Sequence, residues 1–104
     1  MIVLLERVPL TLERLRERKA EILAVAAKHG ASNLRVFGSV ARGKADGNSD
    51  LDLLVDLEEG RSLWDLGGLT ADLEDLLGVR VDVGTARSLR PEIRDEVIAE
   101  AIAL

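Results

Sequence analysis

Cysteine is absent from this chain of 104 residues, histidine occurs once, and only two residues are aromatic. Without cysteine the chain can form no disulfide, thiolate nucleophile or zinc–thiolate site, which is compatible with a reducing compartment. The two aromatic residues, Phe37 and Trp64, are too few to offer a stacking platform for nucleic-acid bases. These absences argue against thiol chemistry and against binding of single-stranded nucleic acid by aromatic stacking.

Long apolar runs are also missing. The start of the chain, Met1–Leu5, is apolar, but Glu6 and Arg7 follow it directly, so it is too short for a signal-peptide core or a membrane span. We therefore expect a cytoplasmic protein that does not enter a membrane. A length of 104 residues gives room for one domain, residues 1–104, with one modest core.

Charge is distributed unevenly around a net value of −5. Residues 1–44 contain nine Lys or Arg and four Asp or Glu, whereas residues 45–104 contain five and fifteen. An acidic chain of this kind is not expected to hold duplex DNA or RNA by neutralising its backbone. The basic half could still face phosphates or an acidic partner, or its arginines could form a solvated helix face paired with glutamates.

The residue pattern predicts the order helix, strand, strand, helix, strand, helix. Helices are expected at residues 11–29 and 63–77 and from Pro91 to the chain end, and strands at residues 34–37, 50–57 and 79–83. This order is typical of an α/β or α+β domain with a small mixed β-sheet packed against helices.

Three details of the helices carry further expectations. Gly67 and Gly68 each cost about 1 kcal/mol relative to alanine inside a helix, so either the helix begins late or something packs very close there. His29 is expected to interact with the end of the first helix, which we favour over a role as general base. The apolar stripe from Ile93 to Leu104 is expected to seal the core, although part of it could dock a partner.

Gly38 and Ser39 stand between the first two predicted strands, where a phosphate could bind. Gly38 would let the backbone approach a ligand closely, and Ser39 is expected to cap a short turn at residues 40–42 and leave backbone N–H groups aimed at an anion. Arg42 and Lys44 could neutralise phosphate charge. The alternative is an ordinary turn with solvated basic residues, which we favour for Lys44 and leave open for Arg42.

Asp50 and Asp52 share one face of the second strand with Leu54 and Asp56. The other face carries Leu51, Leu53, Val55 and Leu57 and is expected in the core. The two aspartates would lie about 7 Å apart along the strand. Like charges this close repel and raise each other's pKa unless a cation separates them, and Mg²⁺ prefers such carboxylate oxygens. Taken alone, the pair could equally keep an exposed edge strand soluble.

A third carboxylate favours the metal-binding interpretation. Asp82 alternates with Val81 and Val83 in the third predicted strand. If this strand pairs beside the second, Asp82 completes a cluster of three carboxylates. Such a cluster can hold two metal ions about 4 Å apart, which activate an attacking oxygen and stabilise a leaving pyrophosphate.

These residues together carry a resemblance to a known family. Gly38-Ser39, ten intervening residues, Asp50-x-Asp52 and the later Asp82 resemble the signature of the DNA polymerase beta-type nucleotidyltransferases. The fuller sequence, Gly-Ser-Val-Ala-Arg-Gly up to Ser-Asp-Leu-Asp-Leu-Leu-Val, is similar to that of the minimal nucleotidyltransferases, which are encoded beside HEPN-domain proteins in prokaryotic toxin–antitoxin pairs. The resemblance covers nearly the whole chain.

The resemblance implies a nucleotidyltransferase fold and an activity. It implies that Gly38 and Ser39 hold the triphosphate of ATP, with Arg42 beside them, and that Asp50, Asp52 and Asp82 are the catalytic and metal-binding residues for two Mg²⁺ ions. Active members of the family transfer AMP from ATP to a tyrosine of the HEPN toxin. Two alternatives stay open: an antitoxin that neutralises the toxin by binding alone, and a small-molecule nucleotidyltransferase completed by a partner chain.

Overall fold

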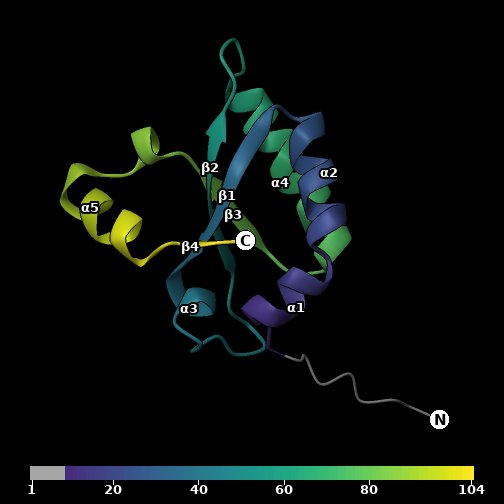
Figure 1. Cartoon of the computed structure of the whole chain (residues 1–104), viewed down its shortest axis with the longest axis vertical. Coiled ribbons are helices and arrows are strands. Elements are labelled where there is room, and N and C mark those ends of the chain that lie inside the picture. Colours follow the sequence, from purple (N-terminus) through teal and green to yellow (C-terminus); the bar gives the residue numbers. More distant parts are fainter. Residues whose placement is uncertain (1–8) are drawn as a thin grey trace.

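The computed structural model describes residues 9–104 and shows a four-stranded sheet with helices on both sides (Figure 1). Helices α2 and α4 cover one side of the sheet, and α5 lies on the other side (Figure 1). No helix within residues 9–104 has the length and apolarity needed to cross a membrane. The apolar start at Met1–Leu5 lies outside the described residues.

The predicted α/β class with a mixed sheet is confirmed, and the structure adds short elements. The helices are α1 (Leu12–Glu17), α2 (Lys19–Lys28), α3 (Gly38–Ala41), α4 (Leu63–Leu77) and α5 (Pro91–Glu100), with a 3-10 turn η1 (Ala86–Ser88). The strands are β1 (Ala31–Phe37), β2 (Leu51–Leu57), β3 (Val81–Gly84) and β4 (Ile102–Ala103). The sequence pattern did not predict α3, η1 or β4.

The strand order is β3-β2-β1-β4. β1 pairs antiparallel with both β2 and β4, whereas β2 and β3 pair in parallel and are connected through α4. Helix α4 therefore makes the long crossover that a parallel pair requires. The parallel register places Asp52 directly beside Asp82, which is the pairing that the predicted carboxylate cluster needs.

One irregularity interrupts β1. Its register against β2 shifts between Ser32 and Arg35, and Asn33 has a left-handed backbone with φ of 50°. This β-bulge lets Ala31, Leu34 and Val36 all be buried, although strict alternation would not put all three on one face.

The core lies between the sheet and helices α2 and α4. The predicted leucine face of β2 is confirmed, because Leu51, Leu53 and Val55 are all at most 1% exposed. They belong to one buried cluster with Leu69 and Leu73 of α4. Full burial of a side chain of this size contributes about 1.5–3 kcal/mol, so this cluster is a main source of stability.

The expected single helix at residues 11–29 is wrong, because Arg18 breaks it into α1 and α2. Arg18 has a non-helical backbone, with φ −110° and ψ 18°. Its guanidinium reaches across to donate a 2.7 Å hydrogen bond to the carbonyl of Leu76 near the end of α4, and it also pairs with Glu21. A contact with a residue so distant in sequence is invisible to local periodicity.

The two glycines of α4 have different surroundings. The helix begins at Leu63, where Ser62 and Asp65 form a capping box, so a late start is ruled out. A Cβ atom on Gly68 would lie 2.8 Å from Cε1 of His29, so the imidazole is the close neighbour that the glycine admits. A Cβ on Gly67 would meet nothing within 4 Å.

His29 does more than end a helix. It is the C-cap residue of α2, and its Nε2 also donates a 2.6 Å hydrogen bond to the Asp72 carboxylate on α4. This hydrogen bond lowers the pKa of Asp72 below its usual value. His29 therefore joins α2 to α4.

The prediction that the final apolar stripe seals the core is wrong for most of its length. No residue of α5 is buried, and Ile93 and Ile98 are each 42% exposed. The helix ends at Glu100, and the next residues form β4, after which Leu104 does enter the core. Helix α5 is held instead by polar contacts such as that of Arg94, which donates to the carbonyl of Ala86.

Candidate functional site

Three of the residues singled out in the sequence meet where β1, β2 and β3 lie side by side. Phe37, the last residue of β1, pairs with Asp52 of β2, and Asp52 pairs with Asp82 of β3. Gly38 follows Phe37 at once and begins α3. The sheet therefore brings the glycine–serine turn and two of the three aspartates together on one face, which we call the aspartate face.

Gly38 is in direct contact with Asp52. Its backbone is left-handed, with φ of 73°, and an added Cβ atom would overlap the Oδ2 atom of Asp52. Both the backbone conformation and the lack of space therefore exclude a side chain at this position. The close approach expected at Gly38 is present, and its nearest neighbour is the carboxylate itself.

Ser39 does not cap the turn, so that expectation is wrong. The N-cap position of α3 is occupied by Phe37, and Ser39 is the second residue of this four-residue helix. The main chain of Ser39 accepts a 2.9 Å hydrogen bond from the backbone N–H of Lys44, which closes the turn. Lys44 is exposed, in keeping with a solvated role.

Asp52 is the electrostatic centre of the site. Partial burial raises the pKa of its carboxyl above the usual value, and the carboxylates of Asp82 and Asp50 raise the pKa further. Arg42 acts in the opposite direction, and Glu100 adds another increase. Four acidic side chains and one arginine thus share this region, and the excess negative charge would be relieved by a cation.

The donor atoms fit Mg²⁺ in their chemistry. Asp52 and Asp82 occupy neighbouring ladder positions, which lie about 4.8 Å apart in a sheet, and Asp50 directly precedes β2. Carboxylate oxygens are the ligands that Mg²⁺ prefers. As the side chains lie, no three His, Cys, Asp or Glu residues within 9–104 are arranged to hold a metal ion. Metal binding by Asp50, Asp52 and Asp82 stays a prediction.

Glu100 is part of the site although nothing in the sequence singled it out. Its Oε1 atom accepts a 2.9 Å hydrogen bond from the backbone N–H of Gly38 and another of 2.9 Å from Nη1 of Arg42. Arg42 therefore lies where a phosphate-binding arginine was expected, but its present partner is a carboxylate. The contact joins residues 62 positions apart, so the local pattern carried no signal for it.

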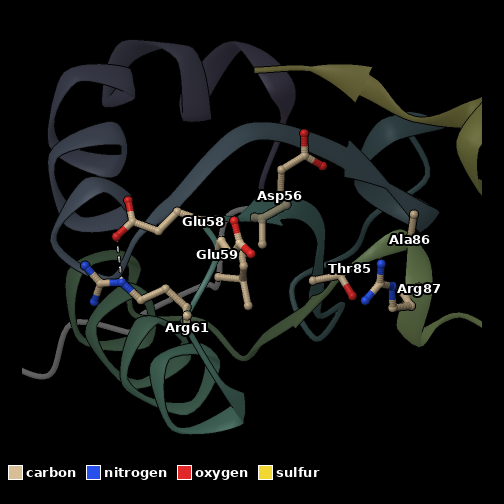
Figure 2. A pocket seen from close by; sticks show the side chains of 10 residues that line it. Asp56, Glu58, Glu59, Arg61, Thr85, Ala86 and Arg87 are labelled. Atoms are coloured by element: carbon tan, nitrogen blue, oxygen red, sulfur yellow. Dashed lines mark hydrogen bonds and ion pairs between the residues drawn. The ribbon is translucent and has the colours of Figure 1, made fainter.

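One cavity lies away from these residues, and another is lined in part by Asp50. One open cavity of about 730 Å³ lies at the far end of β2, where its lining includes Asp56, Thr85 and the ion pair of Glu58 with Arg61 (Figure 2). None of Gly38, Ser39, Arg42, Asp50, Asp52 and Asp82 lines it.

A second cavity adjoins Asp50. Its volume is about 310 Å³, and it is lined by Asp50, the loop before it and the side chains of Arg14 and Arg80, among other residues. This cavity is open to solvent, and of the three aspartates only Asp50 lines it.

Comparisons with known proteins find a matching family and similar chains. A family model described as a nucleotidyltransferase domain matches residues 12–104. A provisionally named protein adenylyltransferase of Methanocaldococcus jannaschii is 42% identical over 86 residues, covering 83% of this chain and 92% of the relative. The protein adenylyltransferase MntA of Thermococcus cleftensis is 43% identical over 75 residues, covering 72% of this chain and 76% of the relative.

Solved structures show the same fold. The structure of a provisionally named minimal nucleotidyltransferase superimposes with a TM-score of 0.80 at 55% identity, covering 91% of this chain and 97% of the other. A crystal structure described as a toxin–antitoxin with AMP-PNP superimposes with a TM-score of 0.70 at 21% identity, covering 82% of this chain and 70% of the other. The second likeness is at the level of the fold.

Proposed function

We propose, because this chain belongs to the minimal nucleotidyltransferase family, that it transfers AMP from ATP to a hydroxyl group of a partner protein and thereby acts as an antitoxin. The observation that carries the proposal is the meeting of Gly38, Asp52 and Asp82 on the aspartate face. The names of the relatives support the acceptor class, since two of them are called protein adenylyltransferases. The toxin–antitoxin structure with AMP-PNP supports an adenine nucleotide as the donor and a toxin as the partner.

Each residue has a role in this proposal. Asp50, Asp52 and Asp82 would hold two Mg²⁺ ions, which when bound neutralise the phosphate charge and stabilise the leaving pyrophosphate. Gly38 donates its backbone N–H to the triphosphate, and Ser39 lies beside it in the same turn. The left-handed turn at Gly38 fixes the direction of this backbone donor.

Arg42 and Asp82 complete the reaction chemistry. The guanidinium of Arg42 donates to phosphate oxygens and offsets the charge that the aspartates concentrate. Asp82, which is more exposed than Asp52, accepts the proton of the attacking hydroxyl. The hydroxyl oxygen then bonds to the α-phosphorus while the bond to pyrophosphate breaks. We propose further that the acceptor is a tyrosine of a HEPN-domain toxin and that the reaction takes place in the cytoplasm.

The test is labelling of the cognate toxin with radioactive ATP and Mg²⁺. Asp52→Asn keeps the shape of the side chain and removes its charge, so we expect labelling to fall by at least about a thousandfold, as when an essential reacting group is removed. Asp56→Asn is the matched control. Asp56 lies on the same strand and face, but it pairs with Arg35 and is four residues further along β2.

Two outcomes would contradict the proposal. Labelling that survives Asp52→Asn would remove the aspartate from the reaction. Full neutralisation of the toxin by the wild-type chain without nucleotide would instead support an antitoxin that works by binding alone.

A further inference from the structure

We propose that Glu100 is an internal competitor of the nucleotide: its carboxylate occupies the donors that bind phosphate, and ATP must displace it. The inference rests on the proposed function, because it takes Gly38 and Arg42 as phosphate donors. It adds a regulatory contact, made by a residue of α5, to the nucleotide site.

The first argument is that two donors converge on one oxygen. Oε1 of Glu100 accepts from the Gly38 N–H and from Nη1 of Arg42, both at 2.9 Å. A carboxylate oxygen held by a backbone N–H and a guanidinium resembles a phosphate oxygen in charge and in its hydrogen bonds. The Gly38 N–H has one proton, so it cannot make a full hydrogen bond to Glu100 and to a phosphate oxygen at the same time. Phosphate binding through these donors therefore requires Glu100 to leave.

The second argument is the charge around Glu100. Besides Arg42, the site holds the carboxylates of Asp50, Asp52 and Asp82, and the nearby negative charge of Glu100 raises the pKa of Asp52. Glu100 therefore adds negative charge beside three carboxylates while it neutralises Arg42. Its departure lowers the negative potential that an incoming triphosphate meets and frees Arg42 at the same time.

The third argument is that Glu100 can move. Its side chain is 28% exposed, so rotation into solvent is open to it. Helix α5 has no buried residue, and Glu100 is its last residue. The backbone after Glu100 stays in place when its side chain moves, because Ile102 and Ala103 pair with β1. Substitutions of the Glu100 side chain should therefore leave the core intact.

The experiment compares the binding of ATP in the presence of Mg²⁺ by calorimetry to four proteins: wild type, Glu100→Gln, Glu100→Asp and Glu96→Gln. Glu100→Gln removes the charge that competes with phosphate. Glu100→Asp keeps the charge on a side chain that is one methylene too short to reach Gly38. Glu96→Gln is the matched control, since Glu96 is exposed one turn earlier on the same helix.

We expect both changes at Glu100 to tighten ATP binding roughly tenfold, as they would if the wild-type site is free of Glu100 about one tenth of the time. Glu96→Gln should bind as the wild type does. Equal or weaker binding by Glu100→Gln would overturn the inference. Tighter binding by Glu100→Gln with unchanged binding by Glu100→Asp would also overturn it, because general repulsion and not the contact would then be the cause.

The outcomes separate this inference from the proposed function. If the wild type binds ATP and labels the toxin while Glu100→Gln gains nothing, the inference alone fails. If Glu100→Gln gains affinity but no protein is labelled, the acceptor in the proposed function fails and the competition stands. If none of the four proteins binds ATP, both fail.

Discussion

The two faces of the sheet differ in polarity and in how far they are covered. The face toward α2 and α4 is apolar and closed, and within residues 9–104 no charged or polar residue is buried. The aspartate face carries Asp52, Asp82 and Asp56 and lies on the side of α5, a helix without a buried residue. One strand, β2, serves both faces, because its side chains alternate. The separation is incomplete at one position, because Leu54 alternates with Asp52 and Asp56 on the aspartate face and is fully buried there.

The largest expected effect tests this separation directly. Leu73 on α4 is fully buried, so Leu73→Ala should lower the free energy of unfolding by about 3 kcal/mol. Ile98→Ala on α5 should cost less than about 1 kcal/mol, because Ile98 is 42% exposed and alanine favours the helix. Urea denaturation of both variants measures the difference. Similar losses would mean that α5 contributes to the core after all.

A smaller effect distinguishes the two sides of α4. Gly67→Ala should stabilise the protein by about 0.5–1 kcal/mol, because the new methyl group meets open space and alanine favours a helix. Gly68→Ala should lose this gain or destabilise, because its Cβ would press on His29 and disturb the hydrogen bond to Asp72. Thermal unfolding of the matched pair gives the answer. A gain in stability from Gly68→Ala would show that the α2–α4 contact is loose.

The smallest effect belongs to the aspartate face and depends on pH. The raised pKa of Asp52 means that its charged form is disfavoured by folding, so in metal-free buffer at neutral pH Asp52→Asn should stabilise the protein. We expect on the order of 0.5 kcal/mol, since the carboxyl is partly exposed and solvent screens its repulsion.

The sign of the pH dependence follows from the direction of the shift. As the pH falls through the raised pKa of Asp52, the folded state takes up a proton before the unfolded state does, so wild-type stability recovers relative to Asp52→Asn. The advantage of the variant should therefore be full at neutral pH and vanish below the ordinary aspartate pKa near 3.8. Thermal scans of both proteins across this range measure it. An advantage that grows as the pH falls would contradict the assignment.

Sequence patterns predicted what depends on neighbours in the chain. The alternation in β2 and the helix at residues 63–77 both follow from local rules, and both are present. The position of Asp82 beside Asp52 was conditional on strand pairing, which a single sequence does not specify. The parallel pairing of β2 with β3 in the structure places Asp82 beside Asp52.

The parts that were missed depend on contacts across the chain. Arg18 interrupts the helix and donates a hydrogen bond to the carbonyl of Leu76, which is 58 residues further along the chain. Glu100 accepts a hydrogen bond from Gly38, which is 62 residues earlier. β4 has only two residues, too few to show a period. The apolar stripe of α5 was real in the sequence, but amphipathic spacing does not say whether anything covers the stripe.

The bulge in β1 changes which side chains of that strand face the core. Ala31 is separated from Leu34 by an odd number of steps, and Leu34 from Val36 by an even number, yet all three are buried. One extra residue between Ser32 and Arg35 absorbs the mismatch and leaves Phe37 paired with Asp52. Without Asn33 the residues from Ala31 to Phe37 would alternate regularly, so Ala31, Leu34 and Val36 would still share the core face and Phe37 would still pair with Asp52. A one-residue loss at this position would therefore straighten β1 and leave both the core and the turn at Gly38 in place.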